Sequence, residues 1–166
     1  MIRLASIALA VSLSCSPVAA GTFSIPTKHP IATVDIPDNW APKARTSGVE
    51  AKSDDDEIHL ALELVAAADL NSAVQEGVDL LLKGGVKIDA GSVELHPAKI
   101  GDLDGSIVRL SGQYNDRPAN MVLVLFATNA SGKFLLVYYW GSPQGEQDNK
   151  DSLQAIVESI QVQAAK

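Results

Sequence analysis

Histidine is the side chain best suited to acid–base chemistry near neutral pH, and the sequence contains three, His29, His59 and His96. None lies in a helical metal-binding pattern such as H-E-x-x-H. His29 and His96 each precede a proline, in an expected loop and at an expected strand end. His59 shares a strand face with Glu63, but four residues of strand separate them by about 13 Å. Each histidine is therefore interpreted as a surface or hydrogen-bonded residue, and we assign no catalytic residue.

An acidic run, Asp54-Asp55-Asp56-Glu57, contains the carboxylate oxygens that calcium prefers. Consecutive side chains of an extended run point in opposite directions, however, and the glycine and distal glutamate of a calcium loop are missing. We interpret the run as a solvated hairpin tip whose crowded charges discourage pairing at a sheet edge. Residues 101–105, two aspartates between glycines, are likewise interpreted as a turn. We assign no metal site and expect no cofactor.

Motifs for other reactions are also missing from the sequence. No G-x-S-x-G is present, so the common serine-hydrolase elbow is absent. Gly84-Gly85 and Gly101 lack the spacing of a phosphate-binding loop. Asn129-Ala130-Ser131 matches the N-glycosylation pattern, which would matter only in a eukaryotic secretory pathway.

Aromatic side chains with polar atoms suit ligand grooves, and four deserve consideration: Trp40, Tyr138, Tyr139 and Trp140. Tyr138 and Tyr139 lie in a strand that is apolar on both faces, so we interpret them as core residues. Trp40 and Trp140 remain open between the core and an exposed binding surface.

Hydrophobic periodicity predicts the elements that must position these residues. A helix is expected over residues 70–82, with Asp69 as its N-cap and Gly84-Gly85 at its end. A second helix is expected over residues 147–160. The expected strands span residues 31–36, 49–53, 58–65, 93–98, 106–114, 121–128 and 133–140.

The strands over 121–128 and 133–140 are apolar on both faces, which places them mid-sheet with layers on both sides. The strand over 58–65 alternates and is expected to be half-buried. Short turns between strands force antiparallel neighbours. The predicted fold class is therefore α+β, an antiparallel sheet with helices packed on it as an α-β-α sandwich.

The first 20 of the 166 residues have the order of a cleavable secretory signal peptide. A charged start containing Arg3 is followed by ten mainly apolar residues and by Val18-Ala19-Ala20. Bilayer spanning requires about 20 apolar residues, so an anchor helix is disfavoured. A lipid anchor on Cys15 remains an alternative, although Ser14 before it is atypical. We expect cleavage after Ala20 and an exported domain over residues 21–166, periplasmic or extracellular if bacterial.

Composition limits what this exported domain can be. Removing Arg3 lowers Lys+Arg from 13 to 12 against 20 acidic residues, a net charge of −8. This acidity argues against binding nucleic acid or an anionic membrane surface. Cys15 is the only cysteine and is removed with the signal, so no disulfide or thiol chemistry is expected. A domain of this length needs no such crosslink.

Over residues 22–162, several short motifs occur in the order and spacing of the PsbP-like family. They are Ile36-Pro37-Asp38-Asn39-Trp40, the helix over 70–82, Leu103-Asp104-Gly105, Gly132-Lys133-Phe134-Leu135-Leu136 and Val157-Glu158-Ser159-Ile160. The chain thus resembles this family, whose fold is shared by the photosystem II subunit PsbP, a Ran nucleotide-release factor and exported bacterial domains. The resemblance implies the fold without implying a reaction. No residues match the manganese-cluster or Ran contacts, so neither activity is transferred.

Two functions remain open at this point. The first is a non-enzymatic exported binding or assembly module for an unidentified protein or small ligand. The second is a small secreted hydrolase or other enzyme whose site forms only in the fold, with His59, His96 and nearby carboxylates as candidates. A histidine hydrogen-bonded to a carboxylate inside a pocket would favour the enzyme.

Overall fold

The computed structural model describes residues 19–100, 103–128 and 130–163. Of the expected signal peptide only Ala19 and Ala20 are described, and Cys15 lies outside the described residues. The same holds for Asn129 and for residues 101–102 of the expected turn. No helix in the described part of the chain is long and apolar enough to cross a membrane.

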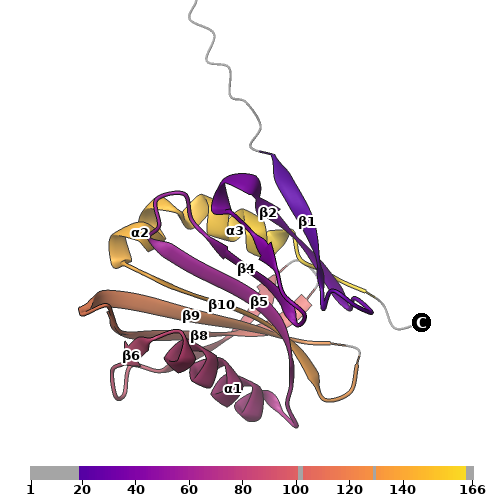
Figure 1. Cartoon of the computed structure of the whole chain (residues 1–166). Coiled ribbons are helices and arrows are strands. Elements are labelled where there is room, and N and C mark those ends of the chain that lie inside the picture. Colours follow the sequence, from indigo (N-terminus) through magenta and orange to yellow (C-terminus); the bar gives the residue numbers. More distant parts are fainter. Residues whose placement is uncertain (1–18, 101–102, 129, 164–166) are drawn as a thin grey trace, which may run out of the picture.

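The described residues form two antiparallel sheets and three α-helices, whose arrangement is shown in Figure 1. The larger sheet has the order β3-β4-β5-β10-β9-β8-β6, with β7 also paired to β8. Its strands are β3 (Lys43–Ala44), β4 (Gly48–Lys52), β5 (Ile58–Ala66), β6 (Val86–Ile88), β7 (Glu94–Ile100), β8 (Leu103–Tyr114), β9 (Arg117–Ala127) and β10 (Lys133–Gly141). The predicted α+β class with antiparallel pairing is confirmed.

One face of the large sheet is covered by α1 (Leu70–Lys83), as Figure 1 shows. The side chain of Asp69 accepts a hydrogen bond from the amide of Ser72 (2.8 Å), which confirms the expected N-cap. Gly77 lies so close to β9 that a Cβ there would meet the Leu123 side chain at 3.0 Å. The α1 side of the sheet therefore forms one core with β8, β9 and β10.

The opposite face is covered by a layer that the sequence predicted only in part. A small sheet of order β1-β2-β11 lies there, together with α3 (Lys150–Glu158). Its strands are β1 (Ala20–Ile25), β2 (Ala32–Pro37) and β11 (Gln161–Val162). The expected α-β-α sandwich therefore has a mixed layer, helix plus sheet, on this side.

Trp40 belongs to this second core and is not a surface residue. It ends a short 3₁₀ turn, Asp38–Trp40, and only 2% of its surface is exposed. Of the two alternatives left open for Trp40, the structure supports the core, because the turn after β2 places the ring among the buried residues of this cluster.

The second expected helix, over residues 147–160, is also wrong in its extent. The chain forms α2 (Pro143–Asp148) and then α3, with Asn149 between them at φ −97° and ψ 7°. Ser142 caps α2 by accepting a hydrogen bond from the amide of Gly145 (2.9 Å), and Pro143 follows at a position that favours helix starts. These two start signals move the beginning of the helical segment four residues upstream.

Candidate functional site

A groove of about 740 Å³ lies between the large sheet and the α2–α3 segment. Its sheet side, here called the floor, comprises Ile107, Arg109, Asn120, Val122, Val124 and Tyr139. Its helical side, the roof, includes Glu146, Lys150, Leu153, Gln154 and Val157. The volume falls within the range of small-molecule sites in proteins.

The floor follows from the strand alternation of β8 and β9. Ile107 pairs with Val124, and Arg109 with Val122, so these side chains point to the same face of the sheet. The two valines are buried, whereas Ile107 is half-buried and Arg109 is exposed. The floor is therefore apolar in the middle and charged at the side where β8 lies.

One end of the groove is polar because three side chains converge on Glu146. The Tyr139 hydroxyl donates to Glu146 Oε1 (2.7 Å) and the Asn120 amide donates to Oε2 (2.7 Å). Arg109 Nη1 lies 3.4 Å from Oε1. Burial, together with the bond to Glu146, raises the pKa of Tyr139 above its ordinary value of 10.0. Tyr139 is thus a neutral donor at physiological pH.

The acidic run is the exposed tip of the β4–β5 hairpin, as expected, and it also forms hydrogen bonds to the roof. The Asp55 carboxylate accepts from Asn149 Nδ2 (2.8 Å), and Glu57 accepts from the Ser142 hydroxyl (2.5 Å). Both ends of α2 are thereby connected to the turn between β4 and β5.

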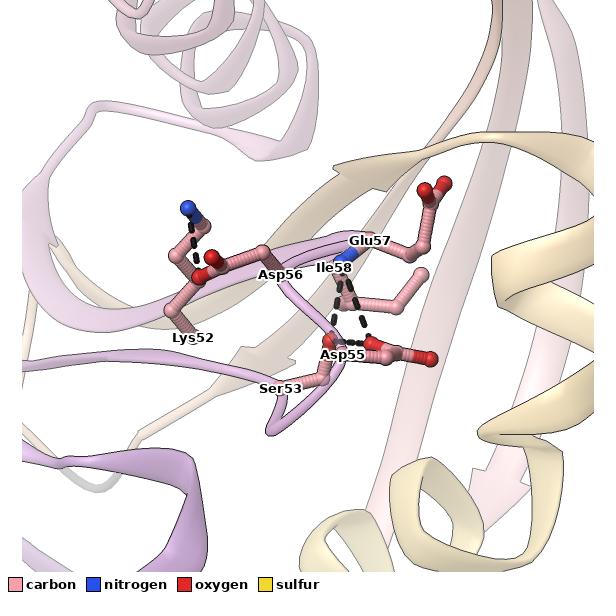
Figure 2. Close-up of polar contacts among 6 residues, drawn as sticks. All are labelled: Lys52, Ser53, Asp55, Asp56, Glu57 and Ile58. Atoms are coloured by element: carbon pink, nitrogen blue, oxygen red, sulfur yellow. Dashed lines mark hydrogen bonds and ion pairs between the residues drawn. The ribbon is translucent and has the colours of Figure 1, made fainter.

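The carboxylates of this turn diverge rather than converge on a point (Figure 2). Asp56 pairs with Lys52 (2.7 Å) on one side, while Asp55 and Glu57 point away from that pair. The buried Ser53 hydroxyl donates to Asp55 and accepts from the Ile58 amide (2.9 Å). Within the described ranges no three acidic, histidine or cysteine side chains are grouped as metal ligands would be.

The three histidines lie in different parts of the fold. His59 stacks on Trp140, with ring centroids 4.9 Å apart and planes at 1°. Burial lowers its pKa below 6.5, with a further contribution from Lys52. His59 lines two smaller hollows of about 520 and 420 Å³, neither of which shares a lining residue with the groove. Among described residues, no hydrogen bond joins His59 to a carboxylate.

His96 lies 3.6 Å from Glu94, but both side chains are exposed on the edge strand β7. His29 lies in the exposed loop between β1 and β2, with a positive φ of 55°. Neither histidine lines the groove. The structure therefore brings none of the histidines into the groove.

Tyr138 and Tyr139 are both buried, as the sequence predicted, and each hydroxyl bonds a carboxylate. Trp140 is half-buried against the end of α1, where a Cβ on Gly84 would meet its ring at 2.9 Å. Its Nε1 is buried without a hydrogen-bond partner among the described residues. Trp40 therefore offers no exposed aromatic surface, and Trp140 offers a partly exposed one in the lining of the 520 Å³ hollow.

Sequence reasoning missed Glu146 and Asn120, which organise the polar end of the groove. Ser142-Pro143 is a helix-start signal that could have placed Glu146 in the first turn of a helix. Asn120 carries no comparable signal, because its role depends on the pairing of β9 with its neighbours.

No protein-family model matches the chain, and no curated protein sequence matches it. Solved structures do resemble it. Cyanobacterial PsbP (CyanoP) of Synechocystis has a TM-score of 0.57 at 10% identity, covering 93% of this chain and 99% of that one. The Ran-binding protein Mog1p of Saccharomyces cerevisiae has a TM-score of 0.52 at 11% identity, covering 87% of this chain and 96% of that one.

A protein of Bacteroides thetaiotaomicron has a TM-score of 0.55 at 13% identity and covers 86% of this chain. This chain spans about half of that longer protein, 48%. At such identities the likeness concerns the fold alone. The resemblance inferred from the sequence motifs is confirmed at that level: the chain has the PsbP-like fold.

Proposed function

We propose that this protein is an exported, non-enzymatic binding module that holds its partner in the groove between the large sheet and α2–α3. The observation that carries the proposal is the groove itself, about 740 Å³ with an apolar floor and an ordered polar end. Sites that recognise ligands combine these two features, since apolar contact supplies affinity and a few polar groups fix orientation.

The chemistry of the groove suits binding better than catalysis. Its lining contains no histidine, the side chain most often used as a general acid or base near neutral pH. The raised pKa of Tyr139 makes it a hydrogen-bond donor and not a proton source. The alternative of a small secreted enzyme would need a histidine and a carboxylate together in a pocket, and no observation favours it. Mog1p, with the same fold, is itself a Ran-binding protein, which is compatible with a binding role.

Export is the second part of the proposal and rests on residues 1–20. Cleavage after Ala20 would be compatible with the fold, because β1 keeps the pairs from Gly21–Ile36 to Ile25–Ala32. It would lose the Ala20–Pro37 pair and the hydrogen bond from the Asp38 amide to the Ala19 carbonyl (2.9 Å). Residues 21–166 would then form the exported domain. The intact mass of the exported protein tests this: a start at Gly21 is expected, and an acylated chain starting at Cys15 would contradict it.

The groove is tested by filling it from the roof. Gln154 is exposed on α3 and lines the groove, so Gln154→Trp places a large ring there without disturbing the core. Ala155, its exposed neighbour outside the lining, provides the matched control Ala155→Trp. Each tagged variant is used to capture partners from envelope extract, and bound proteins and small molecules are identified by mass spectrometry.

We expect Gln154→Trp to lose a molecule that the wild type and Ala155→Trp both retain, with unchanged melting temperatures in all three. Equal capture by Gln154→Trp and the wild type would refute the groove as the binding site. Loss in both variants would also count against it, since the ring at position 155 points away from the groove lining.

A further inference from the structure

The lining of the groove contains three cationic side chains with unused N–H donors. The Arg109 guanidinium carries five N–H donors, and its side chain is 54% exposed. Its one ion pair among described residues is the long 3.4 Å approach to Glu146, and it also lies close enough to the Tyr139 hydroxyl to influence its pKa. Lys150 is exposed in the roof and forms no ion pair with a described residue. Lys99, a third cation in the lining, lies 3.7 Å from Asp104.

The two carboxylates of the groove lining already accept hydrogen bonds. Glu146 takes the donors of Tyr139 and Asn120 at 2.7 Å each. Glu158, the other lining carboxylate, accepts from the Gln154 amide (2.7 Å). Three cations and two carboxylates leave the groove at a net charge of +1 in a chain whose overall charge is −7. This local positive charge favours a bound group that supplies acceptors and negative charge.

Beside these cations the groove is apolar. Val122 and Val124 lie in the floor, and Leu153 and Val157 face them from α3. Val122, Val124 and Leu153 are already buried by the fold, so the apolar surface open to a ligand comes mainly from the partly exposed Ile107 and Val157. An aliphatic chain laid there would bury this area at about 25 cal/mol per Å². A small inorganic anion would leave this surface uncovered, and a neutral hydrocarbon would leave the exposed charges of Arg109 and Lys150 without a ligand group.

We propose that the occupant of the groove is a free, single-chain aliphatic carboxylate. Its carboxylate is held by Arg109 and Lys150, and its chain lies between the valines of β9 and the apolar side of α3. This inference rests on the proposed function and specifies the ligand class of the same groove. Repulsion from the acidic surface of the protein is screened over about 8 Å at physiological salt, so the local cations dominate at contact.

The test is calorimetric titration of the purified protein with dodecanoate below its micellar concentration. Dodecyltrimethylammonium presents the same chain with the opposite charge, and acetate presents the carboxylate without the chain. We expect saturable one-to-one binding of dodecanoate, binding at least about tenfold weaker for the cationic amphiphile, and no detectable binding of acetate. Equal affinity for the two amphiphiles, or no binding of dodecanoate, would overturn the inference.

Substitutions that remove one positive charge at a time test which side chains bind the carboxylate. Lys150→Gln and Arg109→Gln should each weaken dodecanoate binding by about tenfold, the usual effect of losing one charge-assisted hydrogen bond. Lys83→Gln makes the same charge change on α1, behind the sheet, and should leave affinity unchanged. Unchanged affinity in both groove variants would contradict the assignment, as would equal weakening by Lys83→Gln.

Gln154→Trp separates this inference from the proposed function. Loss of dodecanoate binding in Gln154→Trp but not in Ala155→Trp supports both. If dodecanoate never binds while Gln154→Trp still loses its envelope partner, the ligand class is wrong and the groove remains the binding site. An acidic peptide recovered as that partner would identify the other occupant that a cationic groove can take.

Discussion

Replacing Asp55 with alanine removes the acceptor that connects the turn between β4 and β5 to the helical roof. The carboxylate accepts three hydrogen bonds, from the Ser53 hydroxyl, from the Glu57 amide (3.1 Å) and from Asn149 (2.8 Å). Ser53 is only 2% exposed, so water cannot readily replace the lost acceptor. The substitution therefore weakens the turn and the α2–α3 junction together.

The cost follows from the number and exposure of these bonds. A hydrogen bond to a charged group contributes about 1.5–3 kcal/mol when sheltered, and less where water competes. Since Asp55 itself is exposed, we expect a total loss of about 2 kcal/mol in the free energy of unfolding. For a protein of this length that loss lowers the melting temperature by about 4–8 °C.

The loss of stability caused by Asp55→Ala should depend on pH, in a direction that follows from the pKa of Asp55. Burial is the largest influence on Asp55 and opposes ionisation. The hydrogen bonds from Ser53, Glu57 and Asn149 together outweigh it and lower the pKa below 3.8. A carboxyl whose pKa is lower in the folded state stabilises the fold above its unfolded pKa, and the stabilisation disappears as pH falls through the folded value. The difference between wild type and variant should thus be full at pH 5–7 and shrink below about pH 4.

Denaturant unfolding, followed by the fluorescence of the buried Trp40, measures these differences. Asp54→Ala is the matched control, because the Asp54 side chain is exposed and makes no hydrogen bond or ion pair with a described residue. It should change stability by less than about 0.5 kcal/mol. Equal stability of the two variants, or a difference that persists unchanged to pH 2, would refute the reasoning.

Two further predictions concern the α1 side of the sheet. Tyr138→Phe should lower the free energy of unfolding by about 1–2 kcal/mol, because the buried hydroxyl donates to Glu63 at 2.7 Å. Tyr114→Phe is the control, because the Tyr114 hydroxyl has no such partner among the described residues, and it should leave the free energy of unfolding unchanged. Equal losses for the two variants in chemical denaturation would contradict a stabilising role of the Tyr138–Glu63 hydrogen bond. Burial lowers the pKa of His59 in the folded protein, so the unfolded state binds a proton at this side chain more readily than the folded state does. Acidification through about pH 6.5 should therefore destabilise the wild type. His59→Gln should flatten this stability curve between pH 7.5 and 5, and parallel curves would exclude His59 as its cause.

The parts of the fold that the sequence predicted are those with a strong local pattern. The helix over 70–82 has an N-cap, a continuous apolar stripe and a glycine end, and α1 matches it within one residue at each end. β9 and β10 are apolar on both faces and lie mid-sheet, as expected. Asn115 and Asp116 form the turn between β8 and β9, both with positive φ of 51° and 60°, which asparagine and aspartate tolerate best.

The parts that were missed depend on partners distant in sequence. β11 contains only Gln161 and Val162 and exists because it pairs with Thr33 and Ala32. The strand over 58–65 was expected to be half-buried, but Ala61 is buried because β5 runs beside the α1 core. Alanine contributes little to a hydrophobic pattern because its side chain is small. Whether a strand face that contains alanine is buried therefore depends on the element packed against it, which the sequence pattern does not show.

The groove could not be predicted for a related reason. Arg109, Asn120, Tyr139 and Glu146 come from four elements, β8, β9, β10 and α2, and no short spacing connects them. Their meeting depends on the register that pairs Arg109 with Val122 and Val122 with Tyr139 across three strands. A register is determined by the pairing of whole strands, and a motif search does not contain that information.

The two halves of the groove roof are held by different forces, and this links the acidic turn to binding. α3 buries Leu153 and Ile156 in the core, whereas the only buried residue of α2 is Gly145. α2 is therefore positioned by polar contacts, those of Glu57 and Asp55 at its ends and that of Glu146 with the floor. Apolar contacts weaken little with pH, but carboxylate contacts weaken when protonated. The polar end of the groove is thus the end whose geometry depends on ionised side chains, and the acidic turn contributes contacts that position it.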